Sequence, residues 1–104
     1  MSEVRNQKQV LFPLGQTCAT PGALEALERV NRTPLDYLAL HARGNWGGAL
    51  CDEDRRANED AVKSGDRLLS SYFLPDETKL WIITEAADEM GARAATTLLL
   101  PEEY

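Results

Sequence analysis

Two Thr-Pro pairs in the first third of the chain constrain the fold most strongly, because each is typical of the start of an α-helix. Thr20-Pro21 and Thr33-Pro34 each precede an apolar-periodic segment, and the second of these segments ends at Gly44. A threonine hydroxyl can cap a helix, and proline fits the first turn because its missing N–H would have no partner there. Only two residues separate the segments, so we expect two helices packed at a sharp angle.

A third helix is expected over residues 52–64. Asp52 can cap its first turn, and Gly65 follows its last turn. The apolar face of this helix is thin, which predicts a surface position. The apolar face of the first helix is broader and is expected to consist of Ala23, Leu24, Leu27 and Val30.

The second half of the chain predicts β-strands over residues 67–73, 79–85 and 94–100, which are rich in β-branched and aromatic residues. Because these strands follow one another with short connections, antiparallel pairing is favoured. The expected fold class is therefore α+β, with about three N-terminal helices packed on a three-stranded antiparallel C-terminal meander. Residues 9–14 have strand character too, and Pro13 limits them to a short N-terminal edge strand.

The length of 104 residues indicates one domain over residues 9–104, preceded by a flexible arm over residues 1–8. Two cysteines and a single histidine do not supply a disulfide framework or a four-ligand zinc site. We therefore expect no cofactor and no metal. Apolar runs are too short to cross a bilayer, so the sequence predicts a soluble cytoplasmic protein without a membrane partner.

The charge is uneven. Residues 51–104 carry thirteen acidic side chains against six basic ones and account for most of the net charge of −6. Binding to a nucleic-acid backbone depends on cations that neutralise phosphates, so direct nucleic-acid binding is not expected. A basic protein surface, or a partner without strong charge, fits this chain better.

Five motifs in order along the chain carry a family resemblance: LGQTCATPGALEALER, HARGNWG, RLLSSYF, KLWIITEA and TTLLLPEEY. Together they resemble a widespread family of short bacterial proteins described as plasmid-related, some of which carry the label of a type I restriction modification subunit. The resemblance implies a role in mobile-element biology and no particular catalytic residue. Where the family often has Gly-Asp-Trp-Gly, this chain has Asn45, which removes a carboxylate from the motif.

One set of residues has the chemistry of a small metal-independent ribonuclease. His41 and Glu85 could move protons, and Arg93 could hold a phosphate. The competing interpretation is structural, since His41 falls in the last turn of a predicted helix, where histidine commonly serves the exposed carbonyls.

A second set of residues suits a binding surface. Trp46 could be an exposed anchor for a partner, or it could be a plug that closes the core between two helices. Near it, the acidic start of the third helix could contact a basic partner or could simply be a solvated helix terminus. The residues expected to contact a partner are Trp46, His41, Asp52, Glu53 and Asp54.

These observations favour a small non-enzymatic binding or regulatory protein of mobile-element type, which acts through a protein partner and could form a homodimer. Two alternatives stay open. One is the ribonuclease centred on His41, Glu85 and Arg93, and the other is an acidic nucleic-acid mimic that inhibits a host defence system.

Overall fold

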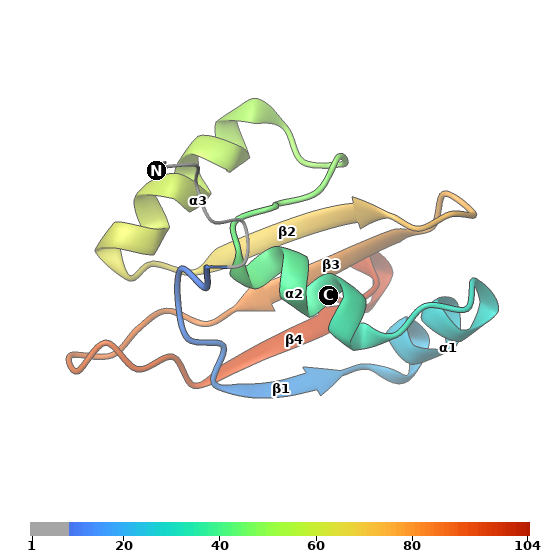
Figure 1. The fold of residues 1–104 in the computed structure, drawn as a ribbon, viewed down its shortest axis with the longest axis horizontal. Helices are drawn as coiled ribbons and strands as arrows, with labels where there is room; N and C mark the ends of the chain where they lie inside the picture. Colours follow the sequence, from blue (N-terminus) through green and yellow to red (C-terminus); the bar gives the residue numbers. More distant parts are fainter. Residues whose placement is uncertain (1–8) are drawn as a thin grey trace, which may run out of the picture.

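The structure is a computed structural model, and it describes residues 9–104; the predicted N-terminal arm, residues 1–8, lies outside the described residues. One mixed sheet and three α-helices make up this part of the chain (Figure 1). The elements follow in the order β1 (Gln16–Ala19), α1 (Pro21–Arg29), α2 (Pro34–Ala42), α3 (Asp52–Ser64), β2 (Leu68–Phe73), β3 (Lys79–Thr84), β4 (Ala95–Leu99) and the short 3₁₀-helix η1 (Pro101–Glu103). None of the helices in residues 9–104 is long and apolar enough to span a bilayer.

The fold is α+β, but the expected three-stranded antiparallel sheet that follows the helices is wrong. The sheet has four strands in the order β1-β4-β3-β2, and the first strand precedes all the helices. β2, β3 and β4 pair antiparallel as expected, whereas β1 pairs parallel with β4 and places Cys18 beside Thr97. The first strand of the chain and its last strand are therefore neighbours.

The expected edge strand over residues 9–14 is also wrong, because this segment packs on helices instead of pairing with the sheet. Leu11 N–H donates to the carbonyl of Ala42 at the end of α2 (2.8 Å), and the Phe12 ring is buried beside Trp46. Pairing starts only after Gly15, whose φ of +67° lets the backbone pass so close to β4 that a Cβ there would lie 2.1 Å from the Arg93 carbonyl oxygen. Leu11, Phe12 and Leu14 thus serve the core, whereas Val10 stays 61% exposed.

Both Thr-Pro pairs begin helices, as predicted. The Thr20 hydroxyl accepts from Ala23 N–H (3.1 Å), and the Asp36 carboxylate accepts from Thr33 N–H (3.0 Å). The expected apolar face of α1 needs one correction: Leu24 is 48% exposed, and Ala26 is buried in its place. The approach of α1 to the sheet is close, since two alanines line its buried face.

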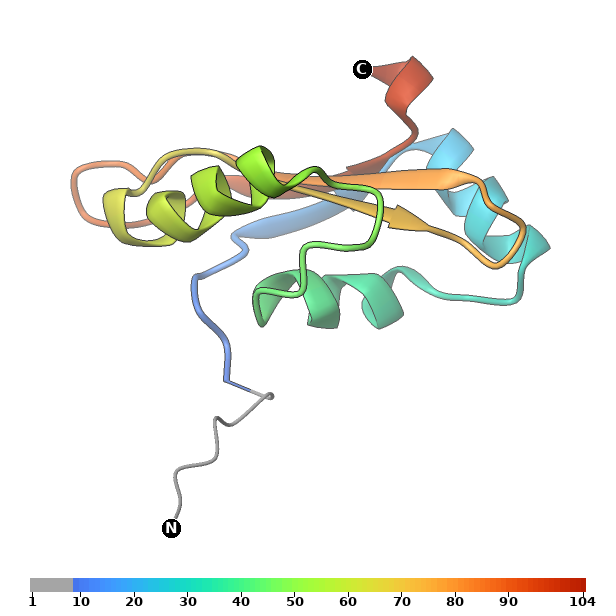
Figure 2. The same ribbon diagram turned by 90° about the horizontal axis from the view of Figure 1, so that it is seen from above.

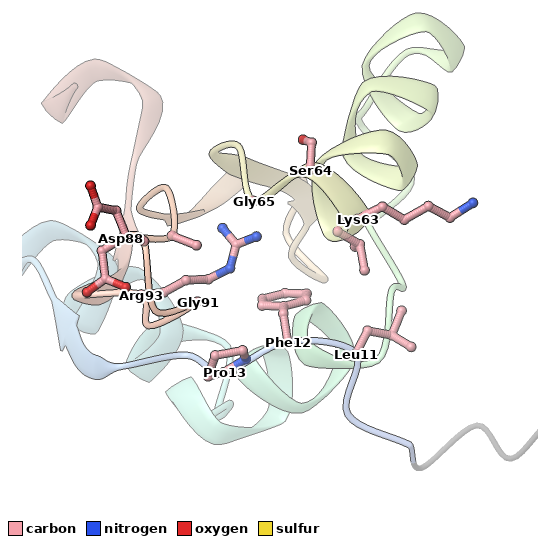
Figure 3. Close-up of a pocket in the computed structure, with 12 residues that line it drawn as sticks. Leu11, Phe12, Pro13, Lys63, Ser64, Gly65, Asp88, Gly91 and Arg93 are labelled. Atoms are coloured by element: carbon pink, nitrogen blue, oxygen red, sulfur yellow. The ribbon is translucent and has the colours of Figure 1, made fainter.

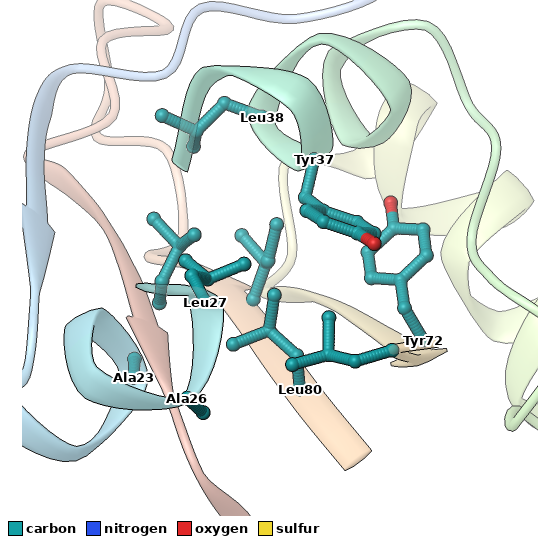
Figure 4. Packing of buried hydrophobic residues seen from close by; sticks show 10 residues of the cluster. Ala23, Ala26, Leu27, Tyr37, Leu38, Tyr72 and Leu80 are labelled. Atoms are coloured by element: carbon teal, nitrogen blue, oxygen red, sulfur yellow. The ribbon is translucent and has the colours of Figure 1, made fainter. Parts of the chain in front are cut away.

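The main core lies between the sheet and the two helices α1 and α2 (Figure 4). Leu27 from α1 and Tyr37 from α2 meet Leu80 and Tyr72 from the sheet, and the two tyrosine rings lie 5.3 Å apart. A second cluster, formed mainly by Phe12, Trp46, Leu50, Ala61 and Leu68, fills the space under α3. Figure 2 shows α2 on one side of the sheet and the C-terminal turn on the other; we call the latter side the outer face.

The β2 edge of the sheet is closed by the segment that joins α2 to α3 and by α3 itself. Ser71 donates its N–H to the Trp46 carbonyl (2.9 Å) and accepts from Ala49 N–H (3.0 Å). Next to it, the Asn58 side-chain amide bonds both the N–H of Leu69 (3.1 Å) and its carbonyl (2.6 Å), as a neighbouring strand would. The outward backbone groups of Leu69 and Ser71, which could pair with another chain, are thereby satisfied.

The closure of this edge predicts opposite outcomes for two adjacent glycines. Gly47 has a φ of +92°, and a Cβ on it would lie 2.1 Å from the Ser71 carbonyl oxygen, whereas a Cβ on Gly48 would meet nothing within 4 Å. Gly47→Ala should lower the free energy of unfolding by about 2 kcal/mol or more. Gly48→Ala, the matched control, should change it by less than about 0.5 kcal/mol. Urea denaturation of both variants measures the difference, and equal stabilities would contradict this account of the edge.

Candidate functional site

The single histidine lies inside the protein, at the centre of a chain of hydrogen bonds. His41, on α2, is 0% exposed. Its Nδ1 lies 2.5 Å from the Ser70 hydroxyl on β2, and its Nε2 lies 2.8 Å from the Thr84 hydroxyl on β3. Thr84 is bonded in turn to the Thr96 hydroxyl on β4 (2.8 Å), which donates to the carbonyl of Leu14 (2.7 Å). The chain of bonds thus ties α2 to three strands and to the segment before β1.

The far end of this chain fixes the direction of its bonds as far as His41 Nε2, and the neutral state of the buried ring fixes the last bond, to Ser70. The Leu14 carbonyl can only accept, so Thr96 uses its proton there and must accept from Thr84. Thr84 then accepts from His41 Nε2–H, and the Ser70 hydroxyl donates to Nδ1. The geometry therefore assigns His41 to the neutral tautomer with its proton on Nε2.

The surroundings of His41 also keep it neutral. Burial, together with the positive charge of Arg93, lowers the pKa of His41 from 6.5 to about 3. Edge-to-face contacts with the rings of Phe12 (5.2 Å between centroids) and Trp46 (5.8 Å) complete the enclosure. A general acid or base needs access to substrate and a pKa near the working pH, and His41 has neither in this conformation.

Arg93 is held by backbone carbonyls. Its residue is 5% exposed, and its guanidinium donates to the carbonyls of Asp66 (2.9 Å), Glu85 (2.9 Å) and Ala61 (3.2 Å). The Ala61 carbonyl belongs to the last turn of α3, where a cation is favourable. Arg93 therefore joins the end of α3 to the ends of β2 and β3.

Of the three residues expected for a ribonuclease, only His41 and Arg93 share a neighbour. The Phe12 ring lies between them, 5.2 Å from the His41 ring and 5.6 Å from the Arg93 guanidinium carbon. Glu85 contacts Arg93 through its backbone carbonyl, while its residue is exposed. The structure thus places Arg93 near both residues without forming a site in which a proton could pass from Glu85 to His41.

A pocket of about 280 Å³ opens beside Arg93, between residues 11–13, the end of α3 and the loop after β3 (Figure 3). The Phe12 ring and the Arg93 guanidinium form one wall, and Lys63, Ser64 and Asp88 lie around the mouth. Asp88 is engaged in its own loop, since its carboxylate accepts from the N–H groups of Met90 and Ala92 (both 2.9 Å). The pocket thus combines charges of both signs, and most of its polar groups already have partners within the chain.

Trp46 is placed in the interior. It is 3% exposed, and its indole N–H donates to the Glu59 carboxylate on α3 (2.8 Å). The ring stacks near Phe12, at 6.1 Å between centroids. In this conformation neither Trp46 nor His41 offers surface to a partner. Both fill the joint between α2, α3 and the sheet.

The acidic start of α3 lies on the surface. Asp52, Glu53 and Asp54 form its first turn and are all exposed. Among the described residues, the ion pair formed by this turn is the long contact between Asp52 and Arg55 (3.9 Å). Negative side chains at this end of a helix are stabilised by its dipole, so the turn can remain charged and open to a basic surface.

The outer face of the sheet carries a hollow of about 280 Å³ that we call the outer hollow; it is lined by Arg67, Ile83, Glu85, Thr97, Leu99 and Tyr104. Ile83 and Leu99 make its floor apolar. The Tyr104 ring packs edge-on against Trp81 at 5.8 Å, and its hydroxyl accepts from Arg67 (2.5 Å). A partner side chain could therefore reach an apolar floor between fixed walls.

The C-terminal turn holds Tyr104 in this position. The Glu103 carboxylate accepts from the Thr20 hydroxyl (2.5 Å), from Gly22 N–H (3.1 Å) and from Leu100 N–H (2.9 Å). These bonds lower the pKa of Glu103 below its usual value. Tyr104 thus contacts Trp81 and Arg67 while 70% of the residue stays exposed.

The outer hollow was not predicted from the sequence, although part of its signal is visible there. Trp81, Ile83 and Glu85 alternate along one strand and indicate two partly apolar faces. The missing information is the strand register, which sets Thr97 opposite Ile83 and Leu99 opposite Trp81. Without that register, Arg67 and Tyr104 cannot be assigned to the same surface, because 37 residues separate them.

Comparison with known proteins adds no template for this site. The chain matches no protein-family model, no curated protein and no solved structure. The family resemblance of the five sequence motifs therefore stays a prediction, and the geometry alone carries the functional argument.

The burial of His41 predicts how stability depends on pH. Because the pKa of His41 is lower in the folded protein than in the unfolded chain, protonation favours unfolding. The contribution of His41 is complete above about pH 6.5 and is lost progressively as the pH falls toward 3. The free energy of unfolding should decrease by about 2 kcal/mol between pH 7 and pH 5.

Urea denaturation at a series of pH values measures this slope, and it needs only the unmodified protein because the chain contains no other histidine. A His41→Gln variant, if folded, should lack most of the slope. A stability that stays flat from pH 7 to pH 5 would contradict the burial of a neutral His41.

Proposed function

We propose that this chain is a small non-enzymatic binding protein that acts through a protein partner. The observation that carries the proposal is the outer hollow, whose floor consists of Ile83 (5% exposed) and Leu99 (6% exposed). The hollow belongs to the outer face of the sheet, the side opposite α2 in Figure 2. By contrast, the most reactive side chains, those of His41 and Arg93, are engaged inside the protein. The molecule thus offers a surface site for recognition, whereas it offers no accessible site for catalysis by His41.

The chemistry of the outer hollow favours an apolar side chain of the partner. Interface anchors are buried side chains that fill a preformed pocket, surrounded by groups that exclude water. Tyr104 and Trp81 form such a rim on one side, and the half-exposed Phe73 ring (52%) extends the apolar surface along the neighbouring strand. An aliphatic or aromatic side chain inserted on Leu99 would therefore be desolvated on several sides.

The charge of the rim favours a basic residue next to that anchor. Arg67 is already engaged by the hydroxyl and the ring of Tyr104. Within residues 9–104, the Glu85 carboxylate takes part in no ion pair or side-chain hydrogen bond, so it is available to a cation. The net charge of −6 would also steer a basic surface toward the protein.

Affinity capture from the native host tests the proposal when it is made with matched variants. Thr97→Arg fills the outer hollow, and Glu85→Lys reverses the charge of its rim. Both should abolish recovery of the partner that the unmodified protein recovers. Glu25→Lys, which makes the same charge change on the exposed side of α1, is the control and should leave recovery unchanged.

A further variant separates the outer hollow from the acidic start of α3. Glu53→Lys should leave recovery within about twofold if the anchor lies in the outer hollow, because a screened surface charge contributes little. Loss of the partner with Glu53→Lys and its retention with Thr97→Arg would overturn the proposal in favour of the acidic turn. Recovery of no specific partner by the unmodified protein would count against both surfaces.

The expected cytoplasmic location and mobile-element role belong to the same proposal. Cys18 and Cys51 are both exposed and free, as suits a reducing compartment. The role in mobile-element biology is supported only by the motif resemblance, and the capture experiment addresses it directly through the identity of the partner.

A further inference from the structure

The two edges of the sheet differ sharply. The β2 edge is closed by the segment 46–49 and by the Asn58 side chain. The β1 edge lies at the other side of the sheet, and no element of the described chain runs beyond it (Figure 1). Natural proteins usually protect such an edge with charges, proline or a bulge, because an open edge can pair with another strand. β1, with the sequence QTCA, contains no charge, proline or bulge, and its protection is limited to its short length of four residues.

The backbone groups of β1 that face outward follow from its pairing with β4. Gln16 N–H donates to the Ala94 carbonyl, and Thr20 N–H donates to the Leu98 carbonyl, both at 3.0 Å. Successive residues of a strand direct their N–H and C=O groups alternately to one side and to the other. The groups of Thr17 and Ala19 therefore point away from the sheet. Two complete donor and acceptor pairs are thus presented along the edge.

β1 and the residues that flank it in the sequence carry no charge, and the Glu103 carboxylate, which accepts from Thr20, lies at one end of the strand. Residues 9–24 form an uncharged run of sixteen residues in a chain whose net charge is −6. Two copies of the chain, which repel each other elsewhere, can therefore approach at β1 without placing like charges together. Beside the edge lies a hollow of about 200 Å³ between β1 and the start of α2, lined by Pro34, Leu38 and Leu98 as well as by the strand.

We propose that a second copy of this chain pairs antiparallel with β1, about a two-fold axis that passes beside Cys18. In this register Thr17 forms a hydrogen-bonded pair with Ala19 of the partner subunit, and Ala19 does the same with Thr17 of the partner subunit. Every outward group is used, and the two sheets join into one sheet of eight strands. An isologous pairing of this kind closes both exposed edges at once.

The proposed register places Cys18 directly opposite Cys18 of the partner subunit. The two residues form a pair without backbone hydrogen bonds, in which the Cα atoms lie about 4.5 Å apart. This separation lies within the range of about 4.4 to 6.8 Å that a disulfide can bridge. Because Cys18 shares the outer face with Thr97, the dimer would also place two outer hollows on one continuous surface. The pairing does not depend on the protein partner proposed above.

The mass in solution tests the pairing, and the two cysteines supply a matched pair of variants. Cys18→Asp would set two carboxylates against each other at the axis, so it should halve the mass of the dimer to that of a monomer. Cys51→Asp makes the same change at the exposed residue before α3, where aspartate is a favourable cap, and should remain dimeric. Sedimentation equilibrium over a concentration series measures all three proteins under reducing conditions.

Two results would overturn the proposal. One is a monomeric mass of the unmodified protein at every concentration, which would leave the β1 edge to a strand of a different protein. The other is a Cys18→Asp variant that remains dimeric, which would place the dimer interface elsewhere.

Oxidative crosslinking tests the register separately. Two single-cysteine proteins are compared under mild oxidation. The Cys51→Ser variant keeps only Cys18, and the triple variant Thr17→Cys, Cys18→Ser, Cys51→Ser keeps only a cysteine at position 17. Two copies should crosslink through Cys18 at least tenfold faster than through the cysteine at position 17. The reason is that Thr17 faces Ala19 of the partner subunit rather than its own counterpart. Faster crosslinking through the cysteine at position 17 would overturn the two-fold axis at Cys18.

Discussion

The buried hydrogen-bond chain through His41 is the interaction on which the rest of this structure depends. One imidazole connects α2 to β2 and β3, and the threonine hydroxyls extend the connection to β4 and to Leu14. A buried polar group without a partner costs about 1–3 kcal/mol, so the chain of bonds tolerates only one arrangement of these elements. It thereby specifies the position of α2 on the sheet more narrowly than apolar packing alone could.

Because His41 is engaged inside the protein, we look for the functional site on the surface. The residues that look most reactive in the sequence each join elements of the fold. His41 does so through its side-chain hydrogen bonds, and Arg93 through hydrogen bonds to three backbone carbonyls. Trp46 packs between α2 and α3 and donates its indole N–H to Glu59. The surfaces that we propose for recognition are the outer hollow and the open β1 edge. Both lie on the sheet and not on the helices.

Local sequence patterns predicted most helices and strands well, but they did not predict which distant strands pair. The two Thr-Pro helix starts, the stop at Gly65 and three of the strands lie close to their expected positions, because capping and alternation are properties of neighbouring residues. The parallel pairing of β1 with β4 joins Gln16 to Ala95, and nothing in a four-residue strand identifies so distant a partner. The outer hollow was missed for the same reason, since it forms only when Arg67 and Tyr104 meet.

The ¹⁵N NMR spectrum of the His41 ring tests the central claim most directly, because it reports the position of each proton. The account predicts a neutral ring with the proton on Nε2, unchanged between pH 8 and pH 5, since the pKa in the folded protein is about 3. A proton on Nδ1, or a titration near pH 6.5, would contradict the directed chain of bonds from Ser70 to Leu14.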